Sequence, residues 1–467
     1  MTQKPNIILI VLDAVRPDHL SCYGYSKPTT PFLEALAAEG MIFDRAFAAA
    51  PWTPPSHASL FTGTYPSRHG VDVDENLYLI GQNPTIAEIL SSKGYATLAI
   101  LPDAHLSQAR GFNRGFNRFE EIFRIPHVSF DRDAAISLFR NLVWGRDGRA
   151  YHSSRLLKNW LHRQVGSYAQ PFFAFLNYKT AHNSYRSPRP FRGRFEISPV
   201  AGQDPRKLRY YANGGAYPYM AGGLQMTEQD MDVLRSWYDG AIAYLDYCIR
   251  DLLNFLKQLG VYDDTMVFIT ADHGENFGDH GLGYHMFCLY DSLMRVPLLM
   301  SYPRLRKSGI KISSLVSLTD VLPTVLELIG CDLREYQEIQ GKSLLPFDGK
   351  EVHDRIFAEF GRPQYMLKRL AARYPQHDFS RYDRGLRCVR TKEFKLIVGS
   401  DGVEELYHLP SDPGETNNLI KQRPEEANVL RLALEDWLAS FKPAPASLPT
   451  REDDLVIVKN LQELGYF

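Results

Sequence analysis

Short apolar runs alternate with helical patterns along most of the chain. Runs rich in β-branched and aromatic residues predict buried strands at residues 7–13, 95–101, 172–178 and 266–271. Helix-forming patterns predict helices at residues 31–39, 85–94, 232–259 and 320–329. Strands that alternate with helices are typical of a mostly parallel sheet with a helical layer on each face. We therefore predict an α/β fold whose central sheet is mostly parallel and flanked by helices.

Local capping signals fix the ends of two of these helices. Thr30 followed by Pro31 has the pattern of an N-cap before a proline in the first turn, and Gly40 stops that helix. Thr85 and Glu88 have the spacing of a capping box. Both signals place a helix directly before or after a predicted strand, as an α/β fold requires.

The pattern changes near residue 348 and divides the chain into two parts. We expect residues 1–348 to form the catalytic α/β domain, with residues 191–224, rich in Gly, Pro, Arg and Tyr, as an irregular insertion near the active face. This insertion could line an entrance for an anionic substrate or form a solvated loop. Residues 349–467 contain strand candidates at 387–391 and 395–398 and a helix at 425–441. They predict a smaller C-terminal α+β subdomain.

Composition excludes several classes of partner. The 467 residues are 44% hydrophobic, and 53 basic against 54 acidic residues leave a formal net charge of −1. With no strong field of either sign, we expect neither a nucleic acid nor a membrane as partner, but a small-molecule anionic ester recognised locally. The five cysteines show no C-x-x-C spacing, and the apolar run at 7–12 is too short for a signal peptide or a membrane span. We expect a cytoplasmic protein, either a monomer or a homo-oligomer.

Chemically useful side chains follow three predicted strands. Asp13 ends the first strand, Asp272 and His273 end another, and His182 follows a third. Open α/β sheets gather their ligands at the carboxyl ends of their strands. Taken singly, each of these residues is more often a turn or capping residue than a ligand. Together with the hydroxyl of Thr53 they provide a mixed oxygen and nitrogen site suited to a divalent cation.

An ordered set of motifs points to one family. The chain resembles the sulfatase family of the alkaline phosphatase superfamily nearly from end to end. The matching stretches are PNIILIVLDAVRPDHLSCYGY, TPPSHASLFTG, ADHGENFGDHG, MRVPLLM, GKSLLP, RTKEFKLI, ELYHLPSDPGETNNL and LQELGYF. The resemblance implies an alkaline-phosphatase/sulfatase-like fold and the hydrolysis or transfer of phosphate or sulfate esters.

The same resemblance assigns candidate roles to individual residues. It implies that Asp13, Asp272 and His273 are metal ligands and that Thr53 is the nucleophile at the same metal. Arg16 matches a basic residue of the first motif, and Asn76 matches a polar residue near the substrate's anionic head. His182 matches a histidine that contacts the transferred group or the leaving oxygen, and His285 falls where sulfatases carry a lysine and many relatives a histidine, so both are further catalytic candidates.

Departures from the sulfatase pattern change the expected chemistry. Thr53 stands where the signature C-x-P-x-R-x-x-x-L-T-G has the Cys that becomes formylglycine, and His57, which we count as a catalytic candidate, replaces its Arg. Ala14 follows Asp13 where many sulfatases have a second Asp, and Asp272 is followed by His rather than Asn. The set resembles the sites of phosphonate monoester hydrolases, phosphodiesterases and phosphoglycerol transferases. We predict one divalent ion, with Mn²⁺ or Zn²⁺ favoured over Ca²⁺, which the site could also accept; a second zinc bound through His182, His280 and His285 is the less favoured alternative.

Three functions remain open from the sequence. The leading hypothesis is a metal-dependent hydrolase or transferase in which Thr53 attacks a phosphodiester or a phosphonate monoester. Threonine is a secondary alcohol and oxidises only to a ketone, so formylglycine chemistry is closed to it. The alternative is a sulfate-ester hydrolase that works without formylglycine. The third is a catalytically inactive sulfatase fold that serves as a binding protein.

Overall fold

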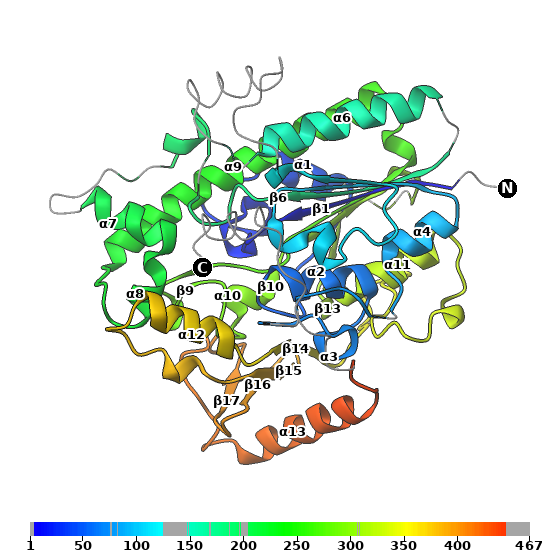
Figure 1. Cartoon of the computed structure of the whole chain (residues 1–467). Coiled ribbons are helices and arrows are strands. Elements are labelled where there is room, and N and C mark those ends of the chain that lie inside the picture. Colours follow the sequence, from blue (N-terminus) through cyan, green and yellow to red (C-terminus); the bar gives the residue numbers. More distant parts are fainter. Residues whose placement is uncertain are drawn as a thin grey trace.

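A mixed eight-stranded sheet runs through the centre of the protein (Figure 1). The computed structural model describes residues 4–74, 77–81, 83–124, 147, 149–167, 170–185, 187–195, 197, 204–305, 307 and 309–444. From one edge to the other, the strands are β12 (Ile310–Ile312), β2 (Met41–Phe43), β11 (Leu298–Ser301), β7 (Thr265–Thr270), β1 (Asn6–Leu12), β6 (Phe172–Tyr178), β4 (Ala96–Leu101) and β5 (Arg118–Glu121). Strands β7, β1, β6, β4 and β5 are parallel, and β11 is antiparallel to both of its neighbours. The predicted α/β class is confirmed.

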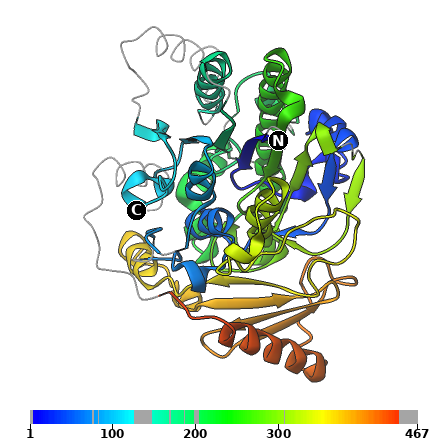
Figure 2. The same ribbon diagram turned by 90° about the vertical axis from the view of Figure 1, so that its right-hand side faces the viewer.

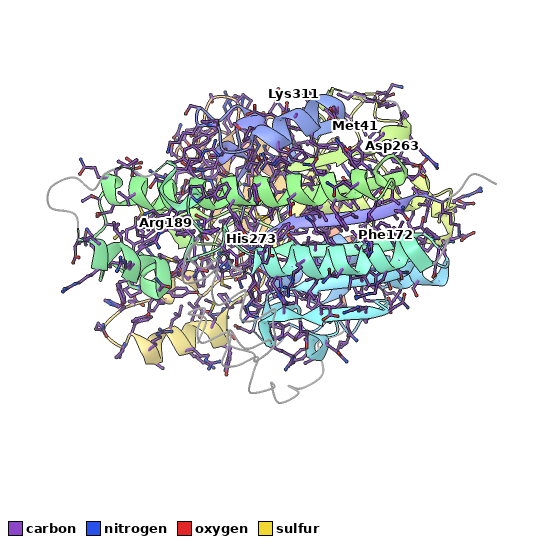
Figure 3. The ribbon with its side chains drawn as sticks, turned by 90° about the horizontal axis from the view of Figure 1, so that it is seen from above. Met41, Phe172, Arg189, Asp263, His273 and Lys311 are labelled. Atoms are coloured by element: carbon purple, nitrogen blue, oxygen red, sulfur yellow. The ribbon has the colours of Figure 1, made fainter. Side chains whose placement is uncertain are left out.

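Helices cover both faces of this sheet, which explains why its central strands are apolar throughout. One face carries α1 (Pro31–Glu39), α6 (Ala150–Ser167) and α9 (Glu228–Gln258), and the last two lie side by side when the molecule is seen from above (Figure 3). The other face carries α2 (Thr53–Thr62), α4 (Ile86–Ser92) and α11 (Val321–Leu328) (Figure 1). All seven residues of β6 are buried as a result.

Capping explains where the predicted helices begin. Helix α1 has the predicted bounds, and α4 opens with the expected capping box, since Thr85 Oγ1 accepts from Glu88 N–H and Glu88 Oε2 accepts from Thr85 N–H. Helix α9 starts four residues earlier than predicted, at Glu228 rather than 232, because Thr227 and Asp230 form a second capping box.

Among the described helices, none combines the length and the apolar character needed to cross a membrane.

A second, antiparallel sheet follows in the C-terminal part of the chain. Its strands are β14 (Ile356–Phe360), β15 (Leu386–Arg390), β16 (Phe394–Gly399) and β17 (Glu404–His408), with α13 (Pro424–Ala439) packed against one face (Figure 2). The two predicted strands and the predicted helix are confirmed, and β14 and β17 are additions. The division at residue 348 stays a prediction.

The segment predicted to be an irregular insertion is partly helical. Within 191–224, the described residues form a short 3-10 turn (Phe191–Gly193), α7 (Pro205–Tyr210), a π-helical turn (Tyr211–Gly215) and α8 (Ala216–Met220). Asp204 caps α7 by accepting from Arg206 N–H, and Pro205 fills the first turn. The expectation of irregular structure is therefore wrong for 205–210 and 216–220, because Pro205 starts a helix, whereas the backbone between them is kinked at Asn213 and Gly214. Helices α7 and α8 lie beyond the carboxyl end of β1 (Figure 1).

Candidate active site

Strand order brings three predicted metal ligands together. Asp13 directly follows β1, and Asp272 and His273 follow the adjacent parallel strand β7. One ligand atom from each of the three side chains lies within 4.8 Å of the others, and all three residues are buried. His273 Nε2 is 3.3 Å from Asp272 Oδ2 and 3.8 Å from Asp13 Oδ1. Figure 3 places His273 beneath the two long helices, at the carboxyl edge of the central strands.

The two carboxylates are only partly hydrogen-bonded: Asp272 Oδ1 accepts from the backbone N–H groups of Ala14 and His273. Both oxygens of Asp13 and Oδ2 of Asp272 are buried without a hydrogen bond from any described residue. Burial and the neighbouring Asp272 raise the pKa of Asp13, and burial raises the pKa of Asp272 to about 7. Unpaired buried carboxylates are costly, and a bound divalent cation would compensate for both. The donor set therefore fits a divalent ion.

His273 has the tautomer that a metal ligand needs. Its Nδ1–H donates to the carbonyl of Gly274 at 2.8 Å, which leaves the lone pair of Nε2 facing the two carboxylates. Burial lowers the pKa of His273 to about 4, so the ring is neutral at physiological pH. A neutral imidazole with a fixed orientation is ready to coordinate a cation.

Thr53 is the first residue of α2 and points its hydroxyl at the same cluster. Thr53 Oγ1 is 3.3 Å from His273 Nε2, and the residue is 1% exposed. The N-terminus of a helix carries a partial positive charge that favours anions. Thr53 thus joins the three ligands in a position where an oxyanion is stabilised.

His57 lies one turn behind Thr53 and supports it. Its Nδ1–H donates to the carbonyl of Thr53 at 2.9 Å, and the side-chain amide of Asn177 donates to its Nε2 at 3.2 Å. The ring packs edge-on against Phe61 and Phe175, and burial lowers its pKa to about 4. Both ring nitrogens are engaged, so the geometry favours a positioning role over the direct catalytic role predicted from the sequence.

The other two histidines extend the cluster. The His285 ring stacks on His273 with centroids 4.4 Å apart, and the His182 ring follows at 4.6 Å from His285. Nδ1 of His182 donates to the carbonyl of Asn183, and Nδ1 of His285 lies 3.4 Å from Glu275 Oε1. Burial lowers the pKa of His182 and lowers that of His285 to about 3. Both rings are therefore neutral at physiological pH.

Of the two predicted substrate-binding residues, the structure describes Arg16 but not Asn76. Arg16 donates to both oxygens of Asp18, to Asp279 and to the carbonyl of Glu275, at 2.7–3.0 Å. These bonds tie the loop after β1 to the loop after β7, and they leave the guanidinium engaged with the protein itself. Asn76 lies outside the described residues.

Sequence reasoning missed a charged pair at the same edge of the sheet. Lys179 directly follows β6, and its ammonium pairs with Asp103, which comes two residues after β4. Asp103 also accepts from the backbone N–H of His105 at 2.8 Å. Although burial opposes it, Lys179 and His105 hold the pKa of Asp103 well below its usual value. A charged residue directly after a fully apolar strand was the available signal, as it had been for Asp13.

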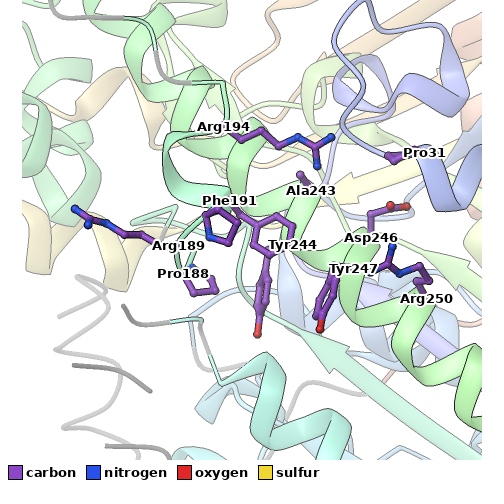
Figure 4. Close-up of a pocket in the computed structure, with 11 residues that line it drawn as sticks. Pro31, Pro188, Arg189, Phe191, Arg194, Ala243, Tyr244, Asp246, Tyr247 and Arg250 are labelled. Carbon is purple, nitrogen blue, oxygen red and sulfur yellow. The ribbon is translucent and has the colours of Figure 1, made fainter. Parts of the chain in front are cut away.

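A separate cavity lies away from this cluster. It has a volume of about 660 Å³ and opens between the loop at 188–194 and helix α9 (Figure 4). Phe191, Tyr244 and Tyr247 form its aromatic wall, with ring centroids 5.2–6.2 Å apart. Arg189 and, from the segment predicted as an insertion, Arg194 also line this cavity.

Comparison with known proteins identifies the family. The chain matches the sulfatase family over residues 5–331 and the C-terminal region of N-sulphoglucosamine sulphohydrolase over residues 278–441. It is 26% identical to arylsulfatase K of Bos taurus, over 91% of this chain and 80% of that one. It is 24% identical to an N-acetylglucosamine-6-O-sulfatase of Bacteroides thetaiotaomicron, over 90% and 83%.

Solved structures agree on the fold. The phosphonate monoester hydrolase of Agrobacterium radiobacter superposes with a TM-score of 0.71 at 23% identity, covering 96% of this chain and all of that chain. A second phosphonate monoester hydrolase, from Silicibacter pomeroyi, superposes with a TM-score of 0.69 at 21% identity, covering 94% and 96%. Since the family match spans more than two thirds of the sequence, the chain belongs to the sulfatase family.

Proposed function

We propose that this protein is a metal-dependent ester hydrolase that uses Thr53 as its nucleophile, with phosphodiesters or phosphonate monoesters as substrates. The observation that carries the proposal is the position of the Thr53 hydroxyl. It lies at the N-terminus of α2, 3.3 Å from His273 Nε2, beside two buried carboxylates of which three oxygens accept no hydrogen bond from the described residues. Asp13, Asp272, His273 and Thr53 would hold the ion.

The first chemical step is displacement at phosphorus. An ion held by Asp13, Asp272, His273 and Thr53 would lower the pKa of the Thr53 hydroxyl and would polarise the ester. Thr53 Oγ1 forms a bond to phosphorus while the bond to the leaving oxygen breaks. His182 or His285, neutral in the free protein, takes the hydroxyl proton and passes it to the leaving oxygen. The product is a phosphothreonine ester, which water then hydrolyses.

The charges of the site favour a substrate with one negative charge. Asp13 and Asp272 contribute two negative charges, which a divalent ion balances, and Lys179 balances Asp103. A phosphodiester, a phosphonate monoester or a sulfate ester brings one further charge, whereas a phosphate monoester brings nearly two at neutral pH. We expect phosphate monoesters to be the poorest of these substrates.

A sulfate ester is the second candidate, and the names of the relatives favour it. Arylsulfatase K and the N-acetylglucosamine-6-O-sulfatase carry that activity in their names. Phosphoryl transfer stays the first choice because a threonine cannot form the hydrated aldehyde through which formylglycine releases sulfate. Transfer to an acceptor alcohol instead of water is a variant of the same mechanism.

The test is a parallel assay of four nitrophenyl substrates: a phosphodiester, a phosphonate monoester, a phosphate monoester and a sulfate ester. The protein is loaded separately with Mn²⁺, Zn²⁺ or Ca²⁺, and Thr53→Ala is the control. Turnover of the phosphodiester or the phosphonate that is lost in Thr53→Ala supports the proposal. Turnover of the sulfate ester alone would replace it by the second candidate. Failure to bind any of the three ions would favour a binding protein.

A further inference from the structure

The order of the strands places a cation beside the metal cluster. Strands β7, β1, β6 and β4 are neighbours, and the residues that follow them include Asp272, Asp13, Lys179 and Asp103. The backbone N–H of Asp13 donates to the carbonyl of Tyr178 at 2.9 Å, so Lys179 leaves the sheet at the level where Asp13 does. The Lys179 ammonium therefore belongs to the same edge as the predicted metal ligands.

The Lys179–Asp103 ion pair is buried, and stability does not explain it. The Lys179 side chain is 8% exposed and that of Asp103 is fully buried. Replacing a buried ion pair by apolar residues of similar size is often neutral or stabilising, because the charges lose their hydration. A buried pair at the edge of a catalytic centre therefore calls for a functional explanation.

The ammonium has hydrogen-bonding capacity to spare. A lysine ammonium has three N–H donors, and Asp103 is the one acceptor that the described residues offer to Lys179. Arg16, the other cation considered for this role, is engaged by protein acceptors.

Asp103 connects the cation to the nucleophile's helix. Asp103 also caps the 3-10 turn Ala104–Leu106, which packs against α2, and the His105 ring meets the Trp52 ring edge-on with centroids 5.7 Å apart. Trp52 is the residue before Thr53. Asp103 and His105 thus fix the ammonium relative to the Thr53 hydroxyl.

We propose that Lys179 is a catalytic residue whose ammonium binds a non-bridging oxygen of the group transferred to Thr53, and that Asp103 and His105 position it. The catalytic part of this inference rests on the proposed function. Its binding part applies to any tetrahedral oxyanion at the site. As Thr53 attacks, negative charge builds up on the oxygens around phosphorus, and a preorganised buried cation stabilises this charge more than the ground state.

The test compares charged and neutral versions of the pair. Lys179→Met alone would leave Asp103 buried and unpaired and could prevent folding. The double variant Lys179→Met/Asp103→Asn removes both charges and keeps the acceptor for His105 N–H. Lys179→Arg is the conservative variant, and Lys158→Met, which breaks an ion pair with Asp251 on the helical face, is the matched control. Thermal unfolding of every metal-loaded variant establishes that it is folded.

Two readouts separate a catalytic from a structural role. Calorimetric titration of the metal-loaded protein with inorganic phosphate and with sulfate measures anion binding without turnover. We expect the double variant to bind both anions about 10- to 100-fold more weakly, the effect of losing one charge-assisted hydrogen bond. We expect its kcat/KM for the nitrophenyl phosphodiester to fall by about 10²–10³-fold. We expect Lys179→Arg to keep part of the anion affinity and part of kcat/KM, and Lys158→Met to match the wild type in both quantities.

The outcomes also distinguish this inference from the proposed function. A folded double variant that keeps wild-type anion affinity and kcat/KM would overturn the role of Lys179 and leave the hydrolase intact. A wild type that turns over no ester but binds phosphate through Lys179 would overturn the hydrolase and support the binding role. If Lys179→Cys regains activity after alkylation with 2-bromoethylamine, which restores an ammonium at that position, the effect belongs to the charge itself.

Discussion

The two buried carboxylates of the site, Asp13 and Asp272, predict that the metal-free protein loses stability as pH rises. Burial raises the pKa of Asp272 to about 7, and burial together with Asp272 raises that of Asp13. An aspartate in the unfolded chain has a pKa of about 3.9. Because the folded state holds the proton more tightly, the stability from Asp272 is fully present below about pH 4 and is lost as pH rises through about 7.

The size of this effect follows from the shift. Asp272 moves from 3.8 to about 7. Three units correspond to about 4 kcal/mol of unfolding free energy, at about 1.36 kcal/mol for each unit. At about 2.1 cal/mol/K for each of the 467 residues, the entropy of unfolding is about 1 kcal/mol/K. The melting temperature of the metal-free protein should therefore fall by about 4 °C through Asp272 alone.

Calorimetry of chelator-treated protein between about pH 4 and about pH 8 measures this fall. We compare the wild type with Asp272→Asn, which cannot ionise, and with Asp263→Asn, an exposed aspartate, as control. We expect the melting temperature of the wild type and the control to fall with pH by about 4 °C more than that of Asp272→Asn. Adding Mn²⁺ at the upper pH should restore the wild type and not Asp272→Asn. Parallel pH profiles of all three proteins would refute the reasoning.

Three further predictions follow from single contacts. Thr53→Ser should keep measurable turnover, whereas Thr53→Ala should lose about 10³-fold or more in kcat; equal activities, measured with the substrate that the wild type prefers, would exclude Thr53 as nucleophile. His57→Leu leaves the Asn177 amide without its acceptor, so it should lower the free energy of unfolding in urea by about 1–3 kcal/mol or more. An unchanged unfolding midpoint would contradict the conclusion that His57 stabilises the start of α2. The Lys395 side chain is 1% exposed and pairs with the largely buried carboxylates of Asp291 and Glu415. Lys395→Met should therefore lower the free energy of unfolding in urea by about 3–5 kcal/mol, whereas Lys421→Met, at an exposed position, should leave it nearly unchanged.

Local signals in the sequence were sufficient for much of the sheet and its helices. The apolar runs that became β1, β6 and β7 are buried on both faces, so they carry a continuous signal that does not depend on their neighbours. The capping box of Thr85 and Glu88 acts within one helical turn, whereas Thr30 makes no side-chain cap and the distant Asp246 accepts from the backbone N–H groups of the first turn of α1. Helix α2 escaped prediction because all of its residues are buried, and without an exposed face its sequence has no amphipathic period.

The sequence by itself also determined which residues could bind a metal, since Asp13 stands directly after a strand and Asp272 and His273 stand two and three residues beyond another. Tertiary structure alone decided the rest. The pairing of Lys179 with Asp103 depends on β6 lying next to β4, and the roles of Arg16 and His57 depend on acceptors and donors far away in the chain. The position of a strand end can be read from local patterns, but the partners of a buried polar group are set by strand order, which no local pattern encodes.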